Sequence, residues 1–106
     1  MKEIIEQAWE DRSLLKNPDT VAAIRALIAL LDEGKVRVAE PVDGEWHVNQ
    51  WIKKGVLLYF PIQELETIEA GPFEFYDKIP LKKDFARRQV RVVPHGIARY
   101  GAYLEP

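Results

Sequence analysis

The spacing of apolar residues predicts that the chain opens with two amphipathic helices. Between Lys2 and about Arg12, apolar side chains recur at intervals that place them on one helix face. Asn17 followed by Pro18 provides an N-cap and a proline at the first helical position, and an apolar face then runs to Gly34, a glycine suited to a helix C-terminus. We expect the two helices to form a hairpin whose aliphatic faces are core or subunit-contact surface.

After the second helix the apolar residues alternate, which predicts a β-hairpin. Val36 and Val38 alternate with charged residues, and Pro41 limits strand pairing. Asp43-Gly44 is a strong turn signal before the second strand, Glu45–Val48.

Asn49 can cap a third helix that runs to Pro61. The run Val56–Phe60 alone is also compatible with a buried strand. The helix is favoured because Lys53 and Lys54 give the segment a polar side and the proline ends it.

The region between this helix and residue 89 is less regular. Leu65–Ile68 is expected to be a short extended piece, and Phe73–Lys82 a loop or strand that packs three aromatic rings on the core. Pro80 interrupts that stretch, and Lys82–Gln89 has the composition of one or two helical turns.

The last residues combine a β-branched run with a six-residue spacing. A strand is predicted to begin at Val90, and beyond Pro94 the apolar Ile97 and Tyr103 stand six apart with small residues between them. A left-handed β-helix places one inward side chain in each six-residue face, so this stretch fits the start of such a solenoid. An ordinary C-terminal tail packed on the core fits the spacing equally well.

The overall prediction is an α+β fold: a small domain of helices plus a β-hairpin over residues 1–89, leading into a strand and the first turn of a left-handed β-helix over residues 90–106. A length of 106 residues corresponds to one domain. No apolar run reaches the ~20 residues that span a bilayer, and the first residues lack the apolar stretch of a signal peptide. A cytoplasmic location is expected, with no membrane partner.

Composition leaves few residues for chemistry. The chain has no cysteine, and its two histidines, His47 and His95, are too few for a convincing metal cluster. Ser13 is the only serine, so covalent catalysis has almost no candidate nucleophile. No catalytic and no metal-binding residue is predicted in this chain.

Charge is distributed unevenly along the sequence. The net charge of −2 argues against a nucleic-acid partner. Residues 1–76 nevertheless carry 8 Lys+Arg against 14 Asp+Glu, whereas residues 77–106 carry 7 against 3. A solvated surface is the ordinary explanation of such a basic segment, although its positive field would also favour a small anionic ligand.

Several short segments of the sequence, in the same order along the chain, resemble the tetrahydrodipicolinate N-succinyltransferase family. They are Val36–Trp46, Val48-Asn49, Trp51–Lys54, Val56–Phe60, Tyr76–Lys82, Arg91–Pro94 and Ala98–Ala102, so the resemblance to the N-terminal part of these enzymes covers essentially the whole chain. It implies an α+β domain, a left-handed β-helix of hexapeptide repeats and a homotrimer. The implied activity is transfer of succinyl from succinyl-CoA to ring-opened tetrahydrodipicolinate in diaminopimelate and lysine biosynthesis.

The resemblance also implies what lies outside these residues. The family's catalytic carboxylates and its CoA-binding cleft belong to the β-helices, beyond Pro106, so the chain by itself is expected to bind no cofactor and to be inactive. Succinyl-CoA would be a co-substrate of the whole enzyme.

Arg91 is the position that matches a family arginine associated with the amino dicarboxylate substrate. A guanidinium offers a planar fork to a carboxylate and stays charged. Val90 and Val92 would lie on the opposite face of a strand, so a solvent-facing arginine without a role has the same pattern.

Arg99 is a second candidate for substrate binding, and could equally pair with a neighbouring carboxylate. His95-Gly96, where relatives often have proline next to Pro94, departs from the family pattern and puts in doubt how rigid the chain is there.

A different class of function fits the same residues. The chain could be a non-catalytic anion-binding or interaction module from a truncated gene. Trimerisation without the β-helix would favour a packing module, whereas dicarboxylate binding by a monomer would favour an independent anion-binding domain.

Overall fold

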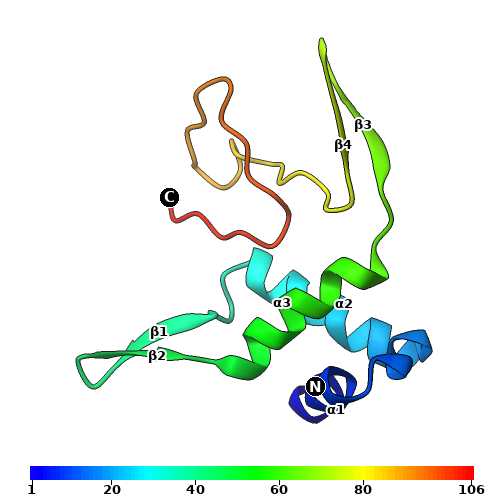
Figure 1. Ribbon diagram of the computed structural model, residues 1–106. Coiled ribbons are helices and arrows are strands. Elements are labelled where there is room, and N and C mark those ends of the chain that lie inside the picture. The colour runs from blue at the N-terminus through cyan, green and yellow to red at the C-terminus, as the bar shows by residue number, and fades with distance from the viewer.

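The computed structural model, which describes residues 1–106, has three helices at one end and two β-hairpins that project from them (Figure 1). Helices α1 (Lys2–Glu10), α2 (Pro18–Asp32) and α3 (Gln50–Ile62) pack against one another, and a 3₁₀ helix, η1 (Arg12–Lys16), joins the first two. The three predicted helices are confirmed, and with the hairpins they make the α+β class that the sequence predicts.

Local sequence explains where α2 begins and ends. The side chain of Asn17 accepts a hydrogen bond from the Asp19 N–H at 2.8 Å, which is the predicted N-cap. At the other end Gly34 has φ of +72°, a left-handed conformation that glycine adopts without penalty.

The hydrophobic core lies between the helices. Ten apolar residues are buried, nine of them on the helices: Ile5, Ala8, Ile24, Leu27, Ile28, Leu31, Ile52, Leu58 and Tyr59, with Ile79 as the tenth. Everything after α3 therefore contributes one fully buried apolar side chain. Burial of apolar surface therefore stabilises mainly the helical layer, and the segments after α3 gain less from it.

The first hairpin begins later than predicted. Strands β1 (Ala39–Val42) and β2 (Glu45–Val48) pair through a turn at Asp43-Gly44, whose φ angles of +51° and +82° suit the predicted tight hairpin turn. The strand expected from Val36 is wrong, because the residues before Ala39 bind the start of α3 instead. The Asn49 N–H donates to the Val38 carbonyl at 2.7 Å, and its side-chain amide donates to the Arg37 carbonyl.

Two details of α3 also differ from prediction. Because the Asn49 side chain is bound to Arg37 and Glu40, it makes no capping hydrogen bond to α3. Pro61 lies just inside the helix, which continues to Ile62.

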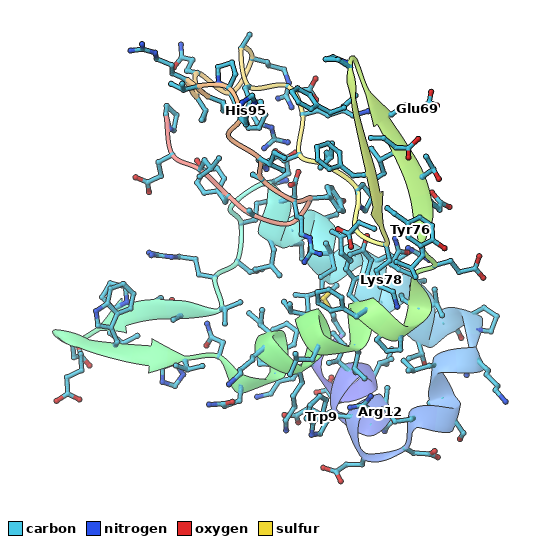
Figure 2. All side chains as sticks on the ribbon, turned by 45° about the horizontal axis from the view of Figure 1, so that its top comes forward. Trp9, Arg12, Glu69, Tyr76, Lys78 and His95 are labelled. Carbon is cyan, nitrogen blue, oxygen red and sulfur yellow. The ribbon has the colours of Figure 1, made fainter.

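The second hairpin, β3 (Glu66–Ala70) with β4 (Phe73–Asp77), is amphipathic. Ile68 pairs with Phe75 and Ala70 with Phe73, which places these four side chains on one face. Glu69 and Tyr76 belong to the opposite face, and Figure 2 shows them turned away from the segment that carries His95. The expected extended piece around residues 65–68 is confirmed, and the aromatic stretch after it is a strand. Its three rings do not pack on the core as expected, because the hairpin projects from the helices: Phe73 and Tyr76 are exposed, and Phe75 is not among the residues that pack on the core.

Residues 78–106 form no helix or strand. The chain runs beside the second hairpin and back past the end of α2 (Figure 1), joined to itself by one bridge between Leu81 and Arg99. Of the one or two helical turns expected here, one forms, closed by the Arg88 N–H on the Asp84 carbonyl at 3.0 Å, and it does not extend into a regular helix. No strand forms at Val90, because its N–H is used by the Phe85 carbonyl at 2.9 Å. A left-handed β-helix beginning in this segment stays a prediction.

Candidate functional site

Arg91 lies on the surface of the C-terminal segment. It is exposed between the half-buried Val90 and Val92, and it forms no ion pair within the chain. Its guanidinium is therefore free to meet a ligand, and equally free to be solvated.

Arg99 is engaged by a carboxylate of the second hairpin. Its Nε and Nη2 donate to the two carboxylate oxygens of Asp77, each at 3.0 Å, while the Phe60 ring lies 5.8 Å from the guanidinium carbon. The backbone N–H of Lys78 is the main cause that lowers the pKa of Asp77, and Arg99 adds to it. The edge of the guanidinium that faces away from Asp77 consists of Nη1 and one Nη2 hydrogen. This open edge remains available to a ligand because the side chain is 52% exposed.

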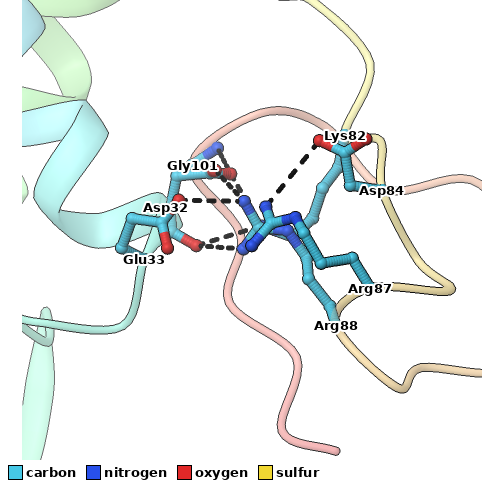
Figure 3. A network of polar contacts seen from close by, with 7 residues as sticks. All are labelled: Asp32, Glu33, Lys82, Asp84, Arg87, Arg88 and Gly101. Atoms are coloured by element: carbon cyan, nitrogen blue, oxygen red, sulfur yellow. Dashed lines mark hydrogen bonds and ion pairs between the residues drawn. The ribbon is translucent and has the colours of Figure 1, made fainter.

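A buried polar cluster lies at the C-terminal end of α2 (Figure 3). Asp32 Oδ1 accepts from Lys82 Nζ at 2.7 Å and from the Gly101 N–H at 2.9 Å, and Oδ2 accepts from Arg88 Nη2 at 3.0 Å. The Asp32 carbonyl accepts from Lys82 Nζ at 3.0 Å and from Arg88 Nη1 at 3.1 Å. Arg88 also reaches Glu33 at 3.0 Å.

The position of Asp32 explains why cations gather there. The last carbonyls of a helix lack partners inside the helix, and the helix dipole favours positive charge at this end. Helix α2 has no basic residue in its last turn. Lys82 and Arg88, fifty and more residues further along the chain, supply the donors and the charge instead.

The cluster is buried, and its charges act strongly on one another. The exposed fractions of the Lys82 and Asp32 side chains are 1% and 7%. Burial by itself would raise the pKa of Asp32, but the hydrogen bonds and positive charges of Lys82, Gly101 and Arg88 outweigh it and leave that pKa below its usual value. Tyr100 lies nearby, and burial together with the charges of Asp32 and Glu33 raises its pKa. The carboxylate is held ionised and saturated with donors, which suits a structural link better than proton transfer.

The sequence pattern does not predict this cluster, because lysines and arginines in a basic segment are expected to be solvated. One signal was available: Asp32 follows Ile28 by four residues and so falls on the buried face of α2. A carboxylate on an apolar stripe needs a cationic partner. The basic segment is where such partners are plentiful, although the sequence does not say which of them bind.

A groove of about 480 Å³ lies between the second hairpin and the C-terminal segment. Its walls are mostly apolar: Ala70, Phe73, Phe75, Leu81, Lys82, Phe85, Val92, Pro94, His95, Gly96, Ile97 and Ala98. Phe73 and His95 meet edge to face across it, with ring centroids 5.4 Å apart. Neither Arg91 nor Arg99 lines this groove.

The structure brings together no group of three or more His, Cys, Asp or Glu residues that could hold a metal ion. None of its helices has the length and apolar character needed to cross a membrane.

Fold and site together define a small α+β domain whose irregular, basic C-terminal third is fastened to a helical core and presents arginines at the surface. Residues 1–62 match the family model described as "Tetrahydrodipicolinate N-succinyltransferase N-terminal". The chain belongs to this family, as the sequence resemblance indicates.

Curated relatives extend the match to the whole chain. Enzymes named 2,3,4,5-tetrahydropyridine-2,6-dicarboxylate N-succinyltransferase from Legionella pneumophila and Ralstonia nicotianae are each 46% identical to it over 98% of its length. The one from Coxiella burnetii is 46% identical over all of it. The chain spans 41% to 42% of the length of these relatives.

Proposed function

We propose that this chain acts as the N-terminal domain of a cytoplasmic, homotrimeric enzyme that transfers succinyl from succinyl-CoA to ring-opened tetrahydrodipicolinate, in diaminopimelate and lysine biosynthesis. The observation that carries the proposal is the identity of 46% along essentially the whole chain to enzymes named for this transfer. The domain's part is to position substrate and to pack against other subunits.

Arg91 is the proposed substrate contact. It is exposed and free of intrachain ion pairs, so its fork can bind one carboxylate of the amino dicarboxylate in two parallel hydrogen bonds. Arg99 supplements it. Asp77 fixes the Arg99 guanidinium from one side, and the open edge can receive a second carboxylate.

The reaction is a direct acyl transfer in which this chain binds rather than reacts. The substrate amine attacks the thioester carbonyl, a C–N bond forms, the C–S bond breaks, and CoA leaves as the thiol once the amine proton has passed to a base. The chain's arginines stay protonated throughout and orient the substrate. Base, oxyanion donors and CoA cleft belong to the segment that relatives have and these residues lack, where a left-handed β-helix is expected to follow.

A chimera tests the proposal. In the chimera, this chain replaces the aligned segment of the Legionella pneumophila relative. Succinyl transfer to the amino dicarboxylate 2-aminopimelate is measured as release of CoA. We expect activity from the chimera, and none from either the 106-residue chain or the relative without this segment. Release of CoA by the chain alone, or a trimeric chimera with no activity, would contradict the proposal.

The alternative of an independent anion-binding module is favoured by one observation, the unpaired Arg91 in a basic segment. Saturable binding of 2-aminopimelate to the isolated monomer would support it. Binding only in the assembled chimera supports the enzyme domain.

A further inference from the structure

The C-terminal third has little apolar attachment to the rest of the molecule. Of the ten buried core residues only Ile79 follows α3, and Tyr100 is one of the partly buried residues packed on that core. With no helix or strand after Asp77, polar contacts supply much of the attachment of this segment.

Lys78 is bound to the end of α3, by its Nζ to the Phe60 carbonyl and by its own carbonyl to Gln63. The polar contacts between residues 82–101 and the helices converge instead on the end of α2, chiefly on Asp32. Asp32 binds the segment at Lys82, at Arg88 and at the Gly101 N–H, so a single carboxylate and its own carbonyl fasten three points spread over twenty residues. The intervening chain is closed on itself by Lys82 N–H to Ala98 at 2.9 Å and by Tyr100 N–H to Pro80 at 2.8 Å. Arg91 lies three residues beyond the Arg88 contact, within the loop that Arg88 and Gly101 delimit.

We propose that Asp32 is a positioning residue: the Asp32, Lys82, Arg88 and Gly101 cluster sets the place of residues 82–101 on the helical core and so determines where Arg91 is presented. The part that concerns Arg91 rests on the proposed function above, whereas the attachment itself does not. No substrate contact is assigned to Asp32, because both of its carboxylate oxygens are already occupied.

The variant Asp32→Asn keeps the shape of the side chain and removes the charge that binds Lys82 and Arg88. Asp84→Asn is the matched control. Asp84 lies in the same segment, its exposed carboxylate only approaches Arg87 at 3.8 Å, and asparagine tolerates its φ of +66°. Should the first variant fail to fold, Arg88→Met removes the contact nearest Arg91 and leaves the Lys82 and Gly101 contacts in place.

Hydrogen exchange of the 106-residue chain tests the attachment. In Asp32→Asn we expect the amides of Lys82, Tyr100 and Gly101 to exchange at least tenfold faster than in the wild type, while the Ile28 amide in α2 is accelerated by a clearly smaller factor, set by the loss of global stability alone. Arg88→Met should accelerate residues 83–91 in the same way, and Asp84→Asn should change neither region. Equal acceleration of α2 and the C-terminal segment, or none in either, would overturn the proposal.

Kinetics of the chimera test the link to Arg91. Asp32→Asn should raise KM for 2-aminopimelate about tenfold while KM for succinyl-CoA and kcat change less than twofold, a split that simple loss of folded enzyme cannot produce. Local acceleration of exchange with an unchanged KM would overturn the link to Arg91 and leave the attachment standing. A wild-type chimera without activity would instead contradict the proposed function, and the exchange measurement would still decide the attachment.

Discussion

At the scale of residues, Asp32 shows how one carboxylate can organise a segment that has almost no core of its own. It ends α2, lies on the buried face of that helix, and accepts from two cations and a backbone N–H. Removing one partner of a buried ion pair costs more than the pair contributes, because the other charge stays buried without compensation.

Lys82→Met tests this asymmetry, with Lys83→Met as its control. Lys82 is buried on Asp32, whereas Lys83 beside it is exposed. We expect the first change to lower the free energy of unfolding by about 3 kcal/mol and the second by less than about 0.5 kcal/mol. Urea unfolding measures both, and equal losses would show that the cluster adds nothing to stability.

The lowered pKa of Asp32 sets a pH dependence. In the unfolded chain the Asp32 carboxyl has a pKa of about 3.9, so it takes up a proton at a higher pH than in the folded protein. The stabilisation is therefore complete above that pH and is lost as pH falls through the folded pKa. Lys82, Arg88 and Glu33 stay near the carboxylate: once it is protonated, Lys82 has no carboxylate partner there and Arg88 keeps only Glu33. Wild type and Asp32→Asn should therefore differ in urea stability at pH 6, and the difference should shrink progressively as pH falls below about 4; a constant difference would contradict this assignment.

At the scale of elements, the sequence predicts what local physics decides. The N-cap at Asn17, the glycine after α2 and the turn at Asp43-Gly44 each follow from the chemistry of one or two residues, and all three are found. Strand starts depend on which partner each backbone N–H and carbonyl finds, and the two predicted from the sequence alone were wrong. Val36 starts no strand because its neighbours bind Asn49, and Val90 starts none because its N–H is taken by Phe85.

The residues of the candidate site likewise divide into those that the sequence could identify and those that depend on contacts between distant segments. Arg91 and Arg99 can be proposed from the sequence, since a resemblance to a family identifies positions without knowing contacts. The pairing of Arg99 with Asp77 was open as an alternative, and the structure confirms that contact. The Asp32 cluster could not be assigned in advance, because it depends on which two of seven basic residues in the last thirty come back to α2.

Gly55 is the element-scale contact that is easiest to test. It lets α3 approach α2 closely, and a Cβ there would overlap the buried side chain of Leu27. Alanine should gain about 1 kcal/mol of helix propensity, yet the overpacking costs about 1–3 kcal/mol. We expect Gly55→Ala to lower the free energy of unfolding, while Gln50→Ala, at an exposed position of the same helix, changes it little. A stabilised Gly55→Ala protein would mean that the two helices pack less closely than described.

At the scale of the whole molecule, a helical layer carries two projecting hairpins and a basic segment (Figure 1). The molecule is flat, with extents of 41 × 39 × 18 Å, and several large apolar side chains face outward, among them Trp46, Phe73, Ile97 and Tyr103. Exposed apolar groups of this number suit a domain that packs against other protein, in keeping with the proposed place of this chain in a larger enzyme.

The most direct test of this account is the kinetic effect of Arg91 in the chimera with the Legionella pneumophila relative. Arg91→Ala should raise KM for 2-aminopimelate at least tenfold with KM for succinyl-CoA unchanged, and Arg91→Lys should restore it only in part, because an ammonium cannot form the bidentate contact. Arg87→Ala, at an exposed arginine of the same segment, is the control and should leave both constants as they are. Equal kinetics for Arg91→Ala and Arg87→Ala in an active chimera would contradict the claim that this domain positions the substrate through Arg91.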